Sequence, residues 1–213
     1  MRNNHPHFIA PQTTLPQEGQ KVLLKREPYL YEAGFIFTGG VFRRHVFETG
    51  EEIPMERILG WAPAYLDGPL VFLDIDGVLT RKPDYGRIDP GLLSEFLRWA
   101  DATRAVLILI SSWREERFYQ TLRRLPRELA DRLADQLPVR FETRAEGILN
   151  WLSQFGQGHT QGVILDDEGD QYRGTPLAPL VVSPDTHTGM KAPGDYLKAF
   201  DIIMNQTLPT DHA

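Results

Sequence analysis

The sequence predicts an α/β fold, a parallel β-sheet with helices on both faces, preceded by a small β-rich domain. Short runs that are apolar at every position alternate with helix-like patterns over the last two-thirds of the chain. Strands of this kind are buried on both faces, as they are in parallel sheets covered by helices. Before them, short β-favouring segments are separated by glycine-containing turns, which is typical of antiparallel hairpins.

A turn-rich segment, Tyr65 to Pro69, separates these two parts, and we place the domains at residues 1–66 and 67–213. In the first domain, four segments favour β-structure, and the turns between them predict two or three hairpins. These segments are Gln20–Lys25, Tyr29–Phe37, Val41–Phe47 and Arg57–Trp61.

The second domain is expected to contain five strands, which are Val71–Leu73, Ala105–Ile110, Val139–Phe141, Val163–Leu165 and Leu180–Val182. Helix starts are marked by Asp89-Pro90, by Pro126 and by the capping box Thr143-x-x-Glu146. Because ligands bind at the carboxyl ends of the strands in open α/β sheets, the residues that follow these strands are the candidates for a functional site.

The composition is that of an ordinary globular protein of 213 residues, with 41% hydrophobic and 24% charged residues. The absence of cysteine excludes disulfides, thiolate metal sites and cysteine nucleophiles. The longest apolar run, Ala105–Ile110, is far shorter than the roughly 20 residues that span a bilayer. A net charge of −6 argues against nucleic-acid binding by the whole surface. We therefore expect a cytoplasmic protein with no membrane partner.

Acidic residues follow two of the predicted strands. Asp74 and Asp76 are spaced by two at the end of the first strand, so their side chains leave the chain on the same side, and Gly77 allows a tight turn there. Asp166 and Asp167 follow the strand Val163–Leu165. Carboxylates at this density repel one another, and a hard divalent cation such as Mg²⁺ relieves that repulsion. The sequence therefore predicts a magnesium site at this edge of the sheet.

The segment Asp74-x-Asp76-Gly77-Val78-Leu79-Thr80, the serine Ser111 after an apolar strand and the pair Asp166-Asp167 after another resemble motifs one, two and four of the haloacid dehalogenase (HAD) superfamily. The resemblance covers roughly residues 70 to 200 and implies a Rossmann-like phosphatase fold. The run Ser-Ser-Trp-Arg from Ser111 is similar to that of the capless branch, which includes domains associated with RNA repair.

By this resemblance, Asp74 is the nucleophile that forms an aspartyl phosphate, and Asp76 is the general acid and base. Ser111 is expected to bind phosphoryl oxygens, with Ser112 and Arg114 as further substrate-binding residues. The Mg²⁺ ligands implied by the family are Asp74, the backbone carbonyl of Asp76, Asp166 and, directly or through water, Asp167.

The third motif of the superfamily is a lysine, or less often an arginine, and here the sequence departs from the common pattern. No lysine lies between Ser111 and Asp166. Arg144 stands at the first position of the predicted helix after Thr143, where the helix dipole and a fixed cation both favour a phosphoryl group. Lys191, after the last predicted strand, is the competing candidate, also as a substrate-binding residue.

Many arginines and no lysine fall between Arg114 and Arg144, interleaved with acidic residues. One interpretation is a salt-bridged solvent face, and the other is a rim that tracks the phosphates of a polynucleotide. The spacing between the motifs leaves no room for a cap domain, which by resemblance to capless relatives favours a bulky substrate such as a polynucleotide end.

The N-terminal segment from Leu15 to Pro63 resembles a small phage and prophage domain of unknown function. The sequence as a whole predicts a Mg²⁺-dependent phosphomonoesterase acting on a phosphorylated substrate, with nucleic-acid ends considered first. Two alternatives stay open. One is a phosphatase for a nucleotide or sugar phosphate with the N-terminal domain as a lid, and the other is a phosphate-binding or interaction module that has lost turnover.

Overall fold

A computed structural model describes residues 10–16, 21–27, 30–44, 52–63, 68–116, 118–139, 143–155 and 160–209. The chain divides into two compact units, Met1–Tyr65 and Leu66–Ala213. Among the described residues, no helix is long and apolar enough to cross a membrane.

The first unit is a five-stranded antiparallel sheet with the strand order β4-β3-β2-β1-β5. Its strands are β1 (Lys21–Glu27), β2 (Leu30–Thr38), β3 (Val41–Arg44), β4 (Glu52–Ile53) and β5 (Gly60–Pro63). Gly39 and Gly40 join β2 to β3 with φ of 59° and 79°, the conformation that a two-residue hairpin turn requires. The predicted hairpins are therefore present, and the parts of the predicted segments at Gln20, Tyr29 and residues 45–47 lie outside the described residues.

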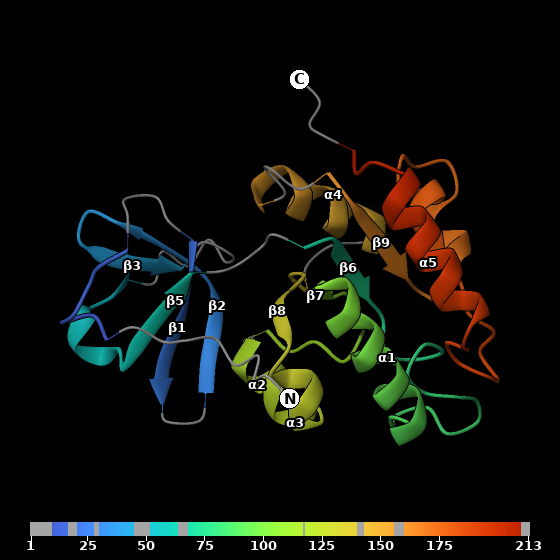
Figure 1. The fold of residues 1–213 in the computed structure, drawn as a ribbon, viewed down its shortest axis with the longest axis horizontal. Helices are drawn as coiled ribbons and strands as arrows, with labels where there is room; N and C mark the ends of the chain where they lie inside the picture. The colour runs from blue at the N-terminus through green and yellow to red at the C-terminus, as the bar shows by residue number, and fades with distance from the viewer. Residues whose placement is uncertain are drawn as a thin grey trace. The chain divides into compact units, whose positions relative to one another are not determined.

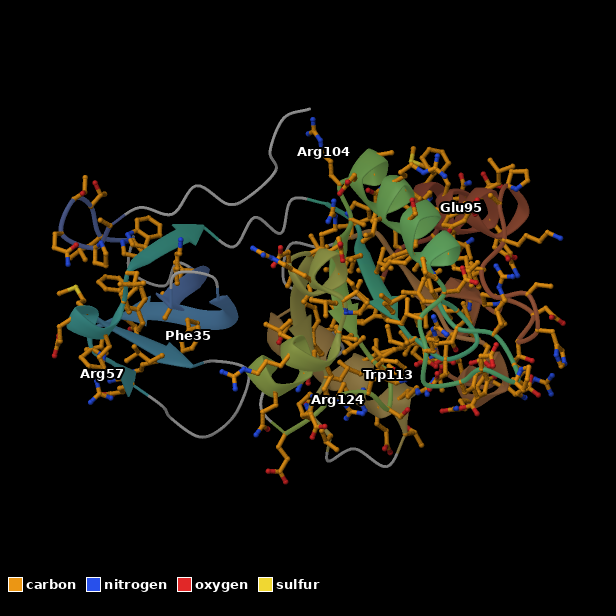
Figure 2. All side chains as sticks on the ribbon, turned by 90° about the horizontal axis from the view of Figure 1, so that it is seen from below. Phe35, Arg57, Glu95, Arg104, Trp113 and Arg124 are labelled. Carbon is orange, nitrogen blue, oxygen red and sulfur yellow. The ribbon has the colours of Figure 1, made fainter. Side chains whose placement is uncertain are left out.

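The predicted strand Arg57–Trp61 is wrong in its first half. Residues Met55–Arg57 form a turn of 3₁₀ helix (η1), and the strand begins only at Gly60. The unit has its own small apolar core, in which Phe35 lies among the strands while Arg57 lies at the surface (Figure 2). Trp61 completes that core and donates its Nε1–H to the carbonyl oxygen of Thr14 at 2.7 Å.

The second unit is built on a parallel five-stranded sheet with the order β10-β9-β6-β7-β8 (Figure 1). Its strands are β6 (Leu70–Leu73), β7 (Val106–Leu109), β8 (Leu133–Gln136), β9 (Gly162–Leu165) and β10 (Val181–Val182). The chain adds β7 and β8 on one side of β6 and then returns to add β9 and β10 on the other. The order reverses between β6 and β9, which is the switch point where open α/β sheets bind ligands.

Helices cover both faces of this sheet. They are α1 (Pro90–Thr103), α2 (Phe118–Arg124), α3 (Arg127–Ala130), α4 (Arg144–Phe155) and α5 (Gly194–Asn205), with 3₁₀ turns η2 (Gly169–Tyr172) and η3 (Ala178–Leu180). Helices α1 and α5 contact each other through the rings of Trp99 and Tyr196, whose centroids lie 5.8 Å apart. Helix α4 packs on the other face of the sheet (Figure 1). There the ring of Trp151 meets that of Phe72 edge-on, with centroids 5.8 Å apart.

The helix starts follow the sequence signals. The carboxylate of Asp89 accepts hydrogen bonds from the backbone N–H groups of Gly91 and Leu92 at 2.8 and 3.0 Å and so caps α1. At α4 the capping box is reciprocal: Glu146 N–H donates to Thr143 Oγ1 at 3.1 Å, and Thr143 N–H donates to a Glu146 carboxylate oxygen at 3.2 Å. This cap fixes Arg144 as the first residue of α4.

The described strand that precedes α4 lies upstream of the predicted strand Val139–Phe141. Val139 lies in a turn, residues 140–142 lie outside the described residues, and the strand is β8 at Leu133–Gln136. The sequence did not predict β8 because polar residues interrupt its apolar pattern. The Gln136 side chain accepts a hydrogen bond from the Thr121 hydroxyl and donates one to the Glu115 carbonyl, both at 2.6 Å. Asp135, one of the acidic residues between Arg114 and Arg144, is buried and accepts a hydrogen bond from Trp151 Nε1 at 2.8 Å.

Candidate active site

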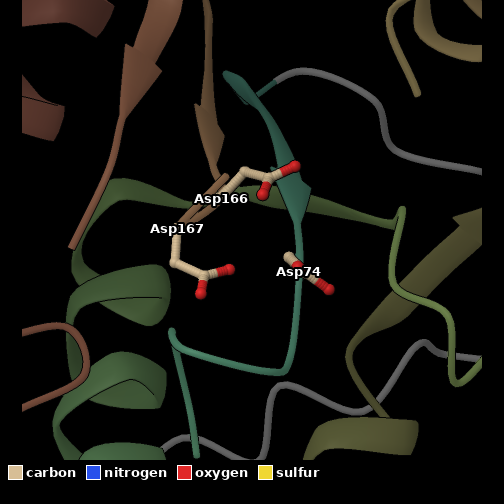
Figure 3. Close-up of side chains that lie close together, drawn as sticks. All are labelled: Asp74, Asp166 and Asp167. Carbon is tan, nitrogen blue, oxygen red and sulfur yellow. The ribbon is translucent and has the colours of Figure 1, made fainter. Parts of the chain in front are cut away.

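Four aspartates follow β6 and β9, on the two sides of the switch point. Asp74 and Asp166 each come directly after a strand and are almost completely buried. Asp74, Asp166 and Asp167 each offer a carboxylate oxygen, and these oxygens lie within 4.8 Å of one another. Figure 3 shows the three carboxylates entering one space, Asp74 from the end of β6 and the other two from the loop after β9. We refer to these three residues as the acid cluster.

The turn after β6 needs glycine for two reasons. Gly77 has a φ of +72°, which other residues rarely adopt. A Cβ atom there would lie 2.2 Å from the Asp167 carboxyl carbon, so a side chain would push Asp167 out of the acid cluster. The glycine of the Asp-x-Asp-Gly segment therefore makes room for the aspartate that comes from β9.

Arg144 is the cation of the acid cluster. Its Nη1 atom lies 2.7 Å from Asp74 Oδ2 and 2.7 Å from Asp166 Oδ2, and its side chain is 17% exposed. Burial lowers the pKa of Arg144, but the charges of Asp74 and Asp166 outweigh burial and raise it above its ordinary value. The guanidinium is therefore charged at every physiological pH and joins the two buried carboxylates.

Burial raises the pKa of Asp74 to about 6. The Arg144 charge opposes this shift, the Asp166 charge adds to it, and hydrogen bonds from the Ser111 hydroxyl and from Ile75 N–H lower the pKa again. The Ile75 N–H donates to Asp74 Oδ1 at 2.7 Å. Asp74 is thus ionised near neutral pH and held by donors on both oxygens.

Asp76 is not one of the three residues of the acid cluster, and two donors fix its side chain. The Thr80 hydroxyl donates to Asp76 Oδ1 at 3.1 Å, and Trp113 Nε1–H donates to Asp76 Oδ2 at 2.9 Å. Thr80 also accepts a hydrogen bond from Gly77 N–H at 3.1 Å, which ties the turn to the same group. The carboxylate of Asp76 is therefore oriented by residues from the loops after β6 and after β7.

A second arginine faces the same region from the loop after β7. Arg114 Nη1 donates to the Ile110 carbonyl at 2.6 Å, while its Nε atom is buried and has no partner among the described residues. Burial and repulsion by Arg144 lower the pKa of Arg114 to about 10, and the Asp74 charge raises it. Two guanidinium groups that repel each other beside a carboxylate favour an anion between them.

The other predicted site residues, Ser111, Ser112 and Lys191, differ in burial and in their contacts. Ser111 is fully buried at the end of β7 and faces Asp74, whereas Ser112 is exposed. Lys191 lies in the loop before α5 with an exposed side chain, and its backbone N–H donates to the Asp195 carboxylate at 2.8 Å. Among the contacts of the described residues, Arg144 is the cation that bonds to Asp74, so the geometry favours it over Lys191 for the third motif.

Three aromatic residues that the sequence did not assign contact the acidic residues. The fully buried Tyr172 donates its hydroxyl to Asp166 Oδ2 at 2.6 Å. The hydroxyl of Tyr85 donates to Asp167 Oδ2 at 3.2 Å. Trp113, labelled in Figure 2, is partly exposed, and its Nε1–H donates to Asp76 Oδ2. Trp113 follows Ser111 by two residues, which was a usable signal, but Tyr85 and Tyr172 stand at no spacing that indicates a contact.

Three of the arginines between Arg114 and Arg144 form ion pairs with acidic residues. Arg124 pairs with Glu115, Arg127 with Asp131 at 3.5 Å and Arg132 with Asp101 at 2.9 Å. Arg117 and Arg140 lie outside the described residues. These pairs favour the salt-bridged solvent face over a phosphate-tracking rim.

A family model of the HAD domain in Swiss Army Knife RNA repair proteins matches residues 70–194. The chain belongs to this family. The HAD domain supports a hydrolase of the phosphatase type, and domains of this kind typically use Mg²⁺, for which the acid cluster offers oxygen ligands. Comparisons with curated proteins and with solved structures gave no match. The N-terminal unit lies outside the matched residues, so its resemblance to a phage domain stays a prediction.

Proposed function

We propose that this HAD domain is a Mg²⁺-dependent phosphomonoesterase that works through an aspartyl phosphate on Asp74 and acts on nucleic-acid ends. The observation that carries the proposal is the environment of Asp74. A buried carboxylate is ionised near neutral pH, is held by the guanidinium of Arg144 and is faced by a second guanidinium with an unpartnered Nε, that of Arg114. A carboxylate nucleophile beside a site for an anion is what attack on a phosphate ester requires.

In the proposed reaction an oxygen of Asp74 attacks phosphorus, and the bond between phosphorus and the leaving oxygen breaks. Asp76 donates a proton to that oxygen, so the leaving group departs as an alcohol. Asp76 then accepts a proton from a water molecule whose oxygen attacks the aspartyl phosphate. Inorganic phosphate leaves, and the carboxylate of Asp74 is regenerated.

The remaining residues have binding roles in this proposal. Arg144 and Arg114 neutralise the phosphoryl oxygens, and the Ser111 hydroxyl donates to one of them. The oxygens of Asp74, Asp166 and Asp167 lie close enough together to share one cation, and hard carboxylate oxygens suit Mg²⁺. Together with the Asp76 carbonyl they are the proposed ligands. Bound there, Mg²⁺ supplies positive charge that balances the developing charge of the phosphoryl group.

Nucleic-acid ends are the proposed substrate because the site carries no inserted domain. The described chain between Asp76 and Ser111 holds only the loop after β6, helix α1 and strand β7. Between Ser111 and Asp166 it holds α2, α3, β8, α4 and β9. The family match to RNA repair proteins supports the same class of substrate.

The test is a substrate panel that measures phosphate release with Mg²⁺ or with EDTA. It contains 3′- and 5′-phosphorylated oligonucleotides, mononucleotides, sugar phosphates and an activated aryl phosphate. We expect Mg²⁺-dependent release that is fastest from one of the oligonucleotides. Equal rates on sugar phosphates would refute the substrate class alone, and no release from any compound would refute the reaction.

Two variants test the assigned roles. Asp76→Asn should slow substrates with basic leaving oxygens by roughly 10²- to 10⁴-fold and the aryl phosphate far less, because proton donation matters least for an acidic leaving group. Asp166→Ala should abolish most of the Mg²⁺-induced rise in melting temperature. Asp170→Ala is the matched control, since Asp170 is an exposed aspartate in η2 that pairs only at the surface with Arg173. An unchanged Mg²⁺ effect in Asp166→Ala would exclude Asp166 as a ligand.

A further inference from the structure

The loop after β6, residues 80–88, carries exposed aromatic and basic side chains next to the acid cluster. Every residue from 81 to 87 is exposed, and the segment contains Arg81, Lys82, Tyr85 and Arg87. The loop is anchored at both ends. Asp89 N–H donates to the Leu79 carbonyl at 2.8 Å, and Lys82 N–H donates to the Thr186 carbonyl at 2.9 Å.

Tyr85 connects this loop to the acid cluster. Its side chain is 40% exposed, although its hydroxyl donates to Asp167 Oδ2 at 3.2 Å. One end of the ring is therefore held at the metal-binding acids while much of the side chain stays open to solvent. Lys82 Nζ lies over the ring, 5.5 Å from its centre, so a cation stands at the aromatic surface.

An exposed aromatic ring with adjacent cations is the arrangement with which proteins hold single-stranded nucleic acid, because any base can stack on the ring and the cations neutralise the backbone. The arginines from 124 to 132 named above are engaged with acidic partners, and in the loop Arg81 pairs with Asp89 at 3.5 Å, whereas Lys82 lies against the Tyr85 ring. The loop therefore offers an aromatic and cationic surface directly beside the acid cluster.

We propose that Tyr85 is the stacking platform for the base of the nucleotide that carries the scissile phosphate, with Lys82 beside the neighbouring backbone phosphate. This inference deepens the proposed function and rests on it. It makes Tyr85 a specificity-determining residue, since the ring on which the base stacks lies next to the acid cluster, with its hydroxyl on Asp167.

The experiment compares two trinucleotides that carry the phosphate at the end hydrolysed fastest in the panel. One is intact, and the other lacks the base at the phosphorylated nucleotide. We define the base preference as the ratio of kcat/KM for the intact trinucleotide to that for the abasic one. The wild type should show a base preference of roughly 5- to 100-fold, which corresponds to the stacking of one base.

Tyr85→Leu should reduce the base preference to near one, whereas Tyr85→Phe should keep most of it because the ring is retained. Phe200→Leu is the matched control, since Phe200 is an aromatic residue of α5 with a similar exposure of 45%. Lys82→Gln should lower the salt dependence of log KM for the intact trinucleotide by about 0.7 per log unit, the value for one phosphate of a single strand.

The results that overturn the inference differ from those that overturn the function. A wild type that hydrolyses both trinucleotides equally well excludes the stacking role and leaves the phosphatase intact. A base preference that survives in Tyr85→Leu does the same. A wild type that hydrolyses neither trinucleotide nor any compound of the panel overturns both.

Discussion

Replacing Arg144 by methionine tests how the acid cluster is stabilised in the absence of metal. The Nη1 atom of Arg144 holds Asp74 and Asp166, whose side chains are only 2% and 0% exposed. Removing one partner of a buried ion pair costs about 3 to 5 kcal/mol, because the remaining charge is buried without compensation. For a domain of this size, we expect the melting temperature to fall by about 6 to 20 °C.

The loss of stability in Arg144→Met should depend on pH. Burial raises the pKa of Asp74 to about 6 while Arg144 acts to lower it, so the pKa of Asp74 rises further when Arg144 is absent. A carboxyl whose pKa is higher in the folded than in the unfolded state binds its proton more tightly when folded, so it stabilises the folded state as the pH falls. The destabilisation by Arg144→Met should therefore be smaller at pH 5 than at pH 8.

The assay is thermal unfolding followed by circular dichroism in EDTA at both pH values. Arg132→Met is the control, because Arg132 pairs with Asp101 at the surface, where an ion pair contributes about 0 to 1 kcal/mol. Adding Mg²⁺ should restore part of the stability of Arg144→Met. If Arg144→Met and Arg132→Met melt at the same temperature at pH 8, the reasoning about the buried pair is wrong.

Three further predictions concern single side chains. In EDTA, Asp74→Asn should be more stable than the wild type at pH 8 by up to about 3 kcal/mol, since the wild type loses stability between pH 4 and 6 as Asp74 ionises. Urea unfolding of both proteins at pH 4 and pH 8 measures this, and an equal change in the free energy of unfolding with pH in the two proteins would contradict it. Tyr172→Phe should cost about 1.5 to 3 kcal/mol in urea unfolding, because it removes a donor 2.6 Å from the Asp166 carboxylate; a cost below about 0.5 kcal/mol would show that this bond does not stabilise the fold. Trp151→Phe should cost about 1 to 3 kcal/mol through the lost donor to Asp135 and leave phosphate release unchanged; an altered rate would place Trp151 in the catalytic chemistry instead.

The sequence was informative where local chemistry determines structure. Asp89-Pro90 and Thr143-x-x-Glu146 marked helix starts, since capping needs only residues three positions apart. The apolar runs around Val71 and Val163 predicted buried strands of the parallel sheet. From these, the positions of Asp74 and Asp166 at one edge of the sheet followed.

The sequence was uninformative where contacts between distant elements determine the structure. Strand β8 contains the buried Asp135 and Gln136, whose polar side chains find hydrogen-bond partners in Trp151, Thr121 and Glu115 of other segments. The contact between Tyr172 and Asp166 depends on how η2 turns after β9, and no periodic pattern in the sequence predicts that turn. Tyr85 lies in a loop without a strand or helix pattern, so nothing in the sequence places its side chain against Asp167.

The most direct test of the central claim is phosphate release by Asp74→Asn with saturating Mg²⁺, measured on the best oligonucleotide and on an activated aryl phosphate. The amide is nearly isosteric with the carboxylate but cannot attack phosphorus, so activity on both substrates should fall by at least a thousandfold. Circular dichroism should show an unchanged fold. Activity within about tenfold of the wild type on either substrate would contradict the assignment of Asp74 as the nucleophile, and with it the aspartyl phosphate.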